Sequence, residues 1–241
     1  MWKTEWLAGA AALTLATLAH AEPTAVTGHV VDADGRPVAN AEIGTFWSFE
    51  GGGQNVWNSF KTDATGAYAG EVDFRGRPVA LLAYDAERTR SGLVVLNEDT
   101  IGDAALIRIE PSVRLHGTIT STALGAAPDW SNVYIMTVPD RVRIASSGGR
   151  NATFDLTLPP GAYTMWAYGT DLQDHTADVT LTRERPDHDL GALDLPITIL
   201  AQHYGKEPPK WSVADARGVK PDVQLADYKG KWVLLEYWGF W

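Results

Sequence analysis

The sequence predicts a mainly β protein, built from two tandem β-sandwiches that follow an export signal. Two observations carry this prediction. Short segments that alternate apolar and polar residues recur from residue 26 to beyond residue 168, and clusters of Gly, Asp, Asn and Pro separate them. Alternation with period two is typical of strands with one buried face, and regular turn signals between short strands are typical of sandwiches. Near the C-terminus the pattern changes, because residues 232–238 are almost continuously apolar. Such a run indicates a strand buried on both faces of a parallel sheet.

Composition and charge limit the possible partners. The chain has 241 residues, of which 45% are hydrophobic and 21% charged, which is ordinary for a globular protein of one large or two smaller domains. The formal net charge is −10, and no run of Lys or Arg interrupts it. A long polyanion would be repelled, so we expect no nucleic acid partner.

The N-terminus has the features of a secretory signal. Lys3 precedes an apolar run over residues 7–18, and Ala19, His20 and Ala21 form a small-x-small cleavage site. The run is shorter than the ~20 residues that span a bilayer. We therefore expect a signal peptide over residues 1–21 and a mature protein that is exported to the periplasm, the cell envelope or the medium without spanning a membrane. An uncleaved anchor is the alternative.

The first sandwich is predicted over residues 24–111. Residues 26–31 alternate, the turn over residues 32–37 contains Gly35, which can take positive φ, and residues 38–43 resume a strand. Together with the turn at 62–68, this sequence resembles the carboxypeptidase regulatory-like domain, a transthyretin-like sandwich. The resemblance implies a scaffold rather than an activity.

A second sandwich is predicted over residues 112–195. Gly117 opens a strand in the same pattern as Gly28, and residues 154–168 alternate around a Pro-Gly turn. Residues 196–209 form a predicted linker, because prolines at its start and end break regular structure.

The last segment, 210–241, is predicted to begin an α/β domain. Its polar turn at 225–231 and apolar strand at 232–238 resemble the opening of thioredoxin-like domains of the peroxiredoxin and thiol-disulfide interchange type. The resemblance implies that a Cys-x-x-Cys motif follows the family-motif residues Trp238, Gly239, Phe240 and Trp241. We therefore expect the chain to be part of a longer protein. With no cysteine of its own, it has no redox activity as given.

Aromatic residues flank a run of three glycines at 51–53. Trp47, Phe49 and Trp57, with Phe46 and Phe60 beside them, could present rings to a sugar or a peptide, or could be core residues of the strands. The histidines show no metal-ligand spacing, and the turn at 32–37 lacks the oxygen ligands of a calcium loop. We expect neither a metal nor a cofactor.

Two functions remain open from the sequence. In the first, the chain is a fragment of an exported thioredoxin-like oxidoreductase or peroxiredoxin-like protein. Its sandwiches are then spacers or docking modules, and its partner is a protein thiol, a disulfide or a peroxide. In the second, the sandwiches are a non-catalytic binding module for an envelope component, a peptide or a glycan.

Overall fold

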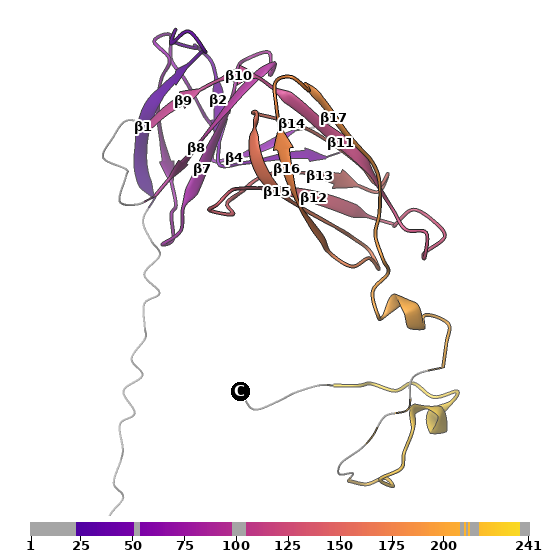
Figure 1. Cartoon of the computed structure of the whole chain (residues 1–241). Coiled ribbons are helices and arrows are strands. Elements are labelled where there is room, and N and C mark those ends of the chain that lie inside the picture. Colours follow the sequence, from indigo (N-terminus) through magenta and orange to yellow (C-terminus); the bar gives the residue numbers. More distant parts are fainter. Residues whose placement is uncertain are drawn as a thin grey trace, which may run out of the picture. The chain divides into compact units, whose positions relative to one another are not determined.

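A computed structural model describes residues 23–50, 54–97, 105–207, 210, 212 and 217–236. Strands dominate these residues, and the helical elements are the 3₁₀ turns η2 (Ala201–His203) and η3 (Leu225–Tyr228) (Figure 1). The predicted mainly β fold is therefore confirmed. The signal sequence expected over residues 1–21 lies outside the described part of the chain. Within that part, no helix has the length and apolar character needed to cross a membrane.

The chain divides into two compact units, and one segment from the first half of the chain belongs to the second unit. The first unit contains residues up to Thr45 together with Trp57–Ile109, and the second contains Phe46–Val56 and the residues from Glu110 onward. Residues 46–56 fall within the predicted first sandwich, whereas their contacts place them in the second unit. Alternation predicts that these residues form a strand, but it does not determine which sheet the strand joins.

The first unit is a sandwich of two sheets. The three-stranded sheet has the order β6-β1-β9, and the other sheet has the order β10-β8-β7-β2-β5, in which the two-residue strand β10 comes just after Ile109, the last residue of this unit. Apolar side chains from both sheets form one buried cluster, which includes Val30 and Tyr68 from the first and Ile43 and Leu81 from the second. The strands are β1 (Thr24–Val31), β2 (Glu42–Gly44), β5 (Phe60–Lys61), β6 (Ala67–Val72), β7 (Val79–Tyr84), β8 (Arg90–Leu96), β9 (Ala105–Arg108) and β10 (Glu110–Pro111).

The second unit also has two sheets. The three-stranded sheet has the order β14-β11-β17, and the six-stranded sheet has the order β16-β15-β12-β13-β3-β4. Where β14 meets β13, the Asp155 backbone N–H donates to Ser147 Oγ at 2.9 Å. The strands are β3 (Phe46–Glu50), β4 (Asn55–Trp57), β11 (Val113–Thr120), β12 (Ser131–Thr137), β13 (Arg143–Gly149), β14 (Thr153–Leu158), β15 (Gly161–Gly169), β16 (His175–Leu181) and β17 (Asp187–Asp194).

The three-stranded sheets of the two units repeat one arrangement. β1 pairs antiparallel with β6 and parallel with β9, and β11 pairs antiparallel with β14 and parallel with β17. Gly28 lies opposite Tyr68, and Gly117 lies opposite Phe154. A Cβ atom added at either glycine would come within 2.6 Å of the facing ring. In each central strand, the missing Cβ of the glycine leaves room for an aromatic ring of the neighbouring strand. This shared packing explains why Gly28 and Gly117 occur in the same sequence pattern.

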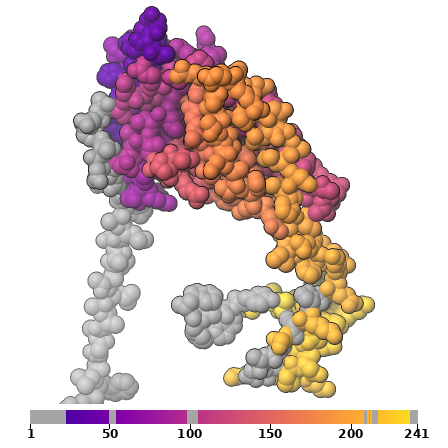
Figure 2. Space-filling view, viewed as in Figure 1, coloured from indigo at the N-terminus to yellow at the C-terminus, as the bar shows by residue number. Residues whose placement is uncertain are grey.

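The strand predicted over residues 232–238 is not present in its described part. Residues 232–236 form no strand, and the side chains of Trp232 and Leu234 are 105% and 92% exposed. A strand of this composition needs neighbouring strands and layers on both faces, and the described residues place none beside it. In Figure 2 the described residues of this last segment are among the yellow atoms. The polar turn expected over residues 225–231 begins with the 3₁₀ turn η3, where the Gln224 N–H donates to Asp227 Oδ2 at 2.8 Å.

Candidate aromatic binding surface

The aromatic residues that the sequence singled out differ in burial. Trp47 is fully buried in β3, which is the position of a core residue. Phe49, two residues along the same strand, is half-buried, and Trp57 on β4 is 49% exposed. Alternation along β3 places Trp47 and Phe49 on one face of the strand and Phe46 on the other. The family-motif residues Trp238, Gly239, Phe240 and Trp241 lie outside the described residues.

A different group of rings gathers on the outer face of the six-stranded sheet. On β12 and β15, the buried residues Ile135 and Met165 point inward, and Tyr134, Trp166 and Tyr168 occupy the alternate positions, where they are half-buried. Tyr134 and Trp166 lie directly opposite each other in the pairing of the two strands. We call the outward group the aromatic surface; it consists of Phe46, Trp130, Tyr134, Arg143, Trp166 and Tyr168.

Three rings of the aromatic surface are nearly parallel. Trp166 and Tyr168 have centroids 5.1 Å apart with an interplanar angle of 26°. Tyr134 lies 5.8 Å from Trp166 at 29° and 5.9 Å from Tyr168 at 11°. Offset-parallel pairs of this kind each contribute ~0.5–1.5 kcal/mol beyond the area they bury. The three rings therefore hold one another in a fixed orientation.

Two further rings extend the surface at its ends. Phe46 on β3 has its centroid 6.1 Å from that of Tyr134, and Trp130, just before β12, lies edge-on to Tyr168 at 5.5 Å and 64°. The aromatic surface thus has Phe46 of β3 at one end. At the other end it has Trp130, in the loop that precedes β12.

Arg143 lies over two of the rings. Its guanidinium carbon is 4.7 Å from the centroid of Tyr134 and 5.1 Å from that of Trp166, within the range of cation–π attraction. A register shift between Ile135 and Met136 places Arg143 opposite Met136 at the start of β13. Arg143 is exposed and forms no ion pair with any residue that the structure describes. Its N–H groups are therefore available to a ligand.

Polar side chains border the rings on the other side. β16 is the strand next to β15, and its exposed Thr176 lies directly opposite Trp166. Asp178, also exposed, lies opposite Thr164 and accepts a hydrogen bond from its hydroxyl at 3.2 Å. The rings of β15 thus lie between a carboxylate and a hydroxyl on β16 and a guanidinium on β13.

Beneath the rings, Asn132 is 3% exposed, and its Oδ1 accepts no hydrogen bond from the described residues. Its side chain hydrogen-bonds Tyr168. Burial raises the pKa of the Tyr168 phenol to about 12, and a hydrogen bond with Tyr134 acts in the same direction. Tyr168 is therefore a neutral hydroxyl at neutral pH.

A second polar site lies on the three-stranded sheet of the same unit. A cavity of about 450 Å³ is bordered by Arg114, His116 and Asp155. Arg114 donates to both carboxylate oxygens of Asp155, at 3.0 and 2.7 Å, and His116 Nε2 lies 2.9 Å from Asp187 Oδ1. These groups pair with one another across adjacent strands, so they act as cross-strand contacts that join the sheet.

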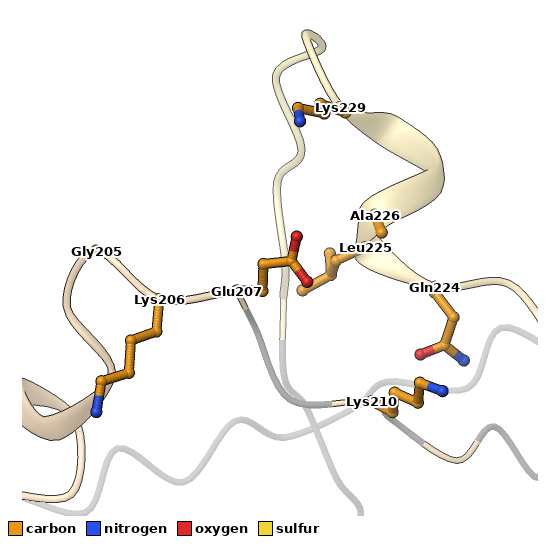
Figure 3. A pocket seen from close by; sticks show the side chains of 8 residues that line it. All are labelled: Gly205, Lys206, Glu207, Lys210, Gln224, Leu225, Ala226 and Lys229. Carbon is orange, nitrogen blue, oxygen red and sulfur yellow. The ribbon is translucent and has the colours of Figure 1, made fainter.

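Another cavity, also of about 450 Å³, is bordered by lysines from residues 206–229 (Figure 3). The side chains of Lys206, Lys210 and Lys229 point in different directions, so they do not converge on a bound anion. Among the described residues, no group of three or more His, Asp or Glu is arranged to hold a metal ion.

Sequence reasoning missed Tyr134, Trp166 and Tyr168 as site residues. The available signal was the pair of aromatic residues two positions apart on one alternating strand, at 166 and 168. Tyr163 lies on the same strand but faces inward and is buried. The sequence alone does not distinguish the inward ring from the outward ones, because that choice depends on the partner strands.

Comparisons with known proteins place the chain in no family. No family model and no curated protein matches it. Among solved structures, the Bacillus anthracis TIE protein is 14% identical over 71% of this chain, with a TM-score of 0.32. A streptococcal ancillary pilin is 10% identical over 73% of the chain (TM-score 0.30), and the shaft pilin SpaA from Lactobacillus rhamnosus GG is 8% identical over 70% (TM-score 0.27).

This chain covers 34% of the length of the first of these proteins, 63% of the second and 97% of the third. At such low TM-scores, the description of the fold rests on the chain's own sheets.

Proposed function

We propose that this protein is an exported, non-catalytic β-sandwich module that binds a peptide, a glycan or another component of the cell envelope through the aromatic surface. Export to the periplasm or cell surface rests on the signal-like residues 1–21. Binding rests on the second unit.

The observation that carries the proposal is the set of near-parallel rings at Tyr134, Trp166 and Tyr168, beside the exposed guanidinium of Arg143. These rings remain half-buried on the outer face of the sheet, whereas the inward residues of the same strands are fully buried. Contiguous aromatic groups that stay partly exposed and are bordered by polar residues are typical of interaction sites in soluble proteins. Tyr, Trp and Arg are also the residues that most often dominate binding energy at interfaces.

The test measures binding of the full chain to three classes of ligand: isolated envelope sacculi by co-sedimentation, a peptide array and a glycan array. We expect the wild-type chain to bind at least one class and Trp166→Ala to lose most of that binding. The matched control is Trp232→Ala, which removes a fully exposed tryptophan far along the chain from the aromatic surface. A wild-type chain that binds none of the three classes, or equal binding by Trp166→Ala, would contradict the proposal.

The carboxypeptidase regulatory-like resemblance of residues 24–111 is compatible with this proposal, because that family is a scaffold appended to exported proteins. The proposal treats the first unit as such a scaffold and assigns no ligand to it.

The resemblance of residues 225–241 to a thioredoxin-like opening supports a second candidate. The chain would then belong to a thiol-disulfide oxidoreductase or peroxiredoxin-like protein, acting on a protein thiol, a disulfide or a peroxide. This candidate rests on the sequence alone, since the described residues 217–236 contain one 3₁₀ turn and no strand. Reading the gene beyond the codon for Trp241 tests it directly, because it requires a cysteine at the next position and another three residues later.

A further inference from the structure

We infer that the ligand of the aromatic surface is an uncharged saccharide chain, packed against the exposed parts of Trp166 and its neighbouring rings and hydrogen-bonded by Arg143 and Asp178. This inference rests on the proposed function and specifies its ligand. Three features of the aromatic surface support it: the orientation of the rings, the polar groups on either side of them, and the balance of charge.

The rings pack against one another and Arg143 lies over two of them, so a sugar would meet the parts of the rings that stay exposed. A pyranose ring has faces of C–H groups and a rim of hydroxyls, so it stacks on an aromatic face while its hydroxyls point sideways. Tyr134, Trp166 and Tyr168 lie within 29° of parallel, with centroids 5.1 to 5.9 Å apart. The rings hold one another in place before a ligand arrives, so little side-chain entropy is lost on binding.

The polar groups lie where the hydroxyl rim of a stacked sugar would reach. In the sheet, β15 is flanked by β16 on one side and by β12, then β13, on the other. Thr176 and Asp178 therefore lie on the strand to one side of Trp166, and Arg143 comes from the other side and lies over the Trp166 ring. A guanidinium offers only donors and a carboxylate only acceptors, whereas a sugar hydroxyl is both. Hydroxyls can thus pair with both sides at once.

The charge of the surface favours a neutral ligand. Arg143 and Asp178 carry opposite charges on the two sides of the rings, so the surface has little net charge of its own. The chain as a whole carries −10, which repels polyanionic saccharides. A strongly basic ligand would meet Arg143 with like charge. An uncharged saccharide avoids both costs.

An extended peptide is the competing occupant. Peptides commonly bind folded sheets by adding a strand to an open edge, where backbone N–H and C=O groups are free. The aromatic surface instead lies on the face of the sheet, where β15 and β12 pair on both sides and side chains alone are presented. The face therefore favours stacking over backbone pairing.

The experiment titrates the full chain with soluble neutral oligosaccharides of glucose, xylose and mannose and follows tryptophan fluorescence. Oligogalacturonate serves as the acidic probe and proline-rich peptides as the peptide probe. We expect at least one neutral saccharide to bind with an affinity that changes less than ~2-fold between low and physiological salt, because no ion pair forms. We expect Trp166→Ala to weaken binding by ~10-fold or more, in line with the loss of a stacking ring.

Separate variants test the polar groups. Arg143→Gln and Asp178→Asn are each expected to weaken neutral-saccharide binding by ~10-fold or more, the loss of a hydrogen bond to a charged group. Trp232→Ala should bind as the wild type does. If Trp166→Ala loses its thermal unfolding transition, Trp166→Leu keeps an apolar side chain at the same position and replaces it in the titration.

The outcomes separate this inference from the proposed function. Binding to the acidic or peptide probe in preference to every neutral saccharide overturns the inference but leaves a binding module. Unchanged affinity in both Arg143→Gln and Asp178→Asn also overturns it. Failure of the wild-type chain to bind any saccharide, peptide or envelope preparation overturns the proposed function as well.

Discussion

The substitution Trp47→Ala tests whether β3 belongs to the second unit, as its pairing with β13 indicates. Trp47 is 0% exposed, and β3 pairs in parallel with β13 of the second unit, with Trp47 opposite Ala145. A buried tryptophan removes ~150–250 Å² from water, which at ~25 cal/mol per Å² corresponds to about 4–6 kcal/mol. Measured Trp-to-Ala substitutions in cores cost ~3–5 kcal/mol. We therefore expect the second unit to lose about 3–5 kcal/mol of its free energy of unfolding.

Hydrogen exchange followed by mass spectrometry shows where that loss falls. Amide protection factors in peptides from β12, β13 and β15 should fall by roughly two to three and a half powers of ten. A tenfold change in the protection factor corresponds to 1.36 kcal/mol of free energy. Peptides from β1, β6 and β7 should keep theirs. The matched control is Ile43→Ala, four residues earlier and also 0% exposed, which lies in the core of the first unit. Its loss, ~2–5 kcal/mol, should fall on β1, β6 and β7. If Trp47→Ala weakens the first unit and spares the second, the assignment of β3 is wrong.

Two smaller predictions concern single buried polar groups. Tyr163 donates to the Pro159 carbonyl at 2.9 Å from a buried position, so Tyr163→Phe should lower the free energy of unfolding by ~0.5–1.5 kcal/mol, measured by urea denaturation. An effect within error would show that this hydrogen bond adds nothing. Burial alone would raise the pKa of Asp85, but hydrogen bonds from Arg90 and Thr89 outweigh it and hold that pKa below its usual value.

Because the folded-state pKa is the lower one, the stabilisation by Asp85 is complete above the unfolded value of ~3.9 and is lost as the pH falls through the folded value. Asp85→Asn should therefore be less stable than the wild type at pH 7, and the difference should shrink below about pH 4. A difference that stays constant with pH would contradict this reasoning.

Local structure could be predicted from the sequence where one residue determines it. Gly35 was expected to allow a turn, and it has φ +80° in the turn where Asp32 Oδ1 accepts N–H groups from Asp34 and Arg36, both at 2.9 Å. The alternation along β1 and β15 likewise predicts strands with one buried face. These features depend on backbone sterics and on a short stretch of chain.

Features that depend on distant partners could not be predicted. The pairing of β3 with β13 brings together Ser48 and Ser146, which are 98 residues apart in sequence. Nothing in residues 46–50 alone distinguishes this pairing from one within the first sheet. The position of Arg143 over Tyr134 and Trp166 follows a register shift in β12 and β13, which has no signature in composition or periodicity. The aromatic surface is therefore visible only once the strands are assembled.

Migration of the full chain in native gels that contain a neutral polysaccharide tests the central claim most directly. Gels are run with and without each polymer, and the wild type is compared with Trp166→Ala and Trp232→Ala. We predict that at least one neutral polymer retards the wild type and Trp232→Ala and leaves the migration of Trp166→Ala unchanged. Equal retardation of all three proteins, or of none by any polymer, would contradict the assignment of the aromatic surface as a saccharide site.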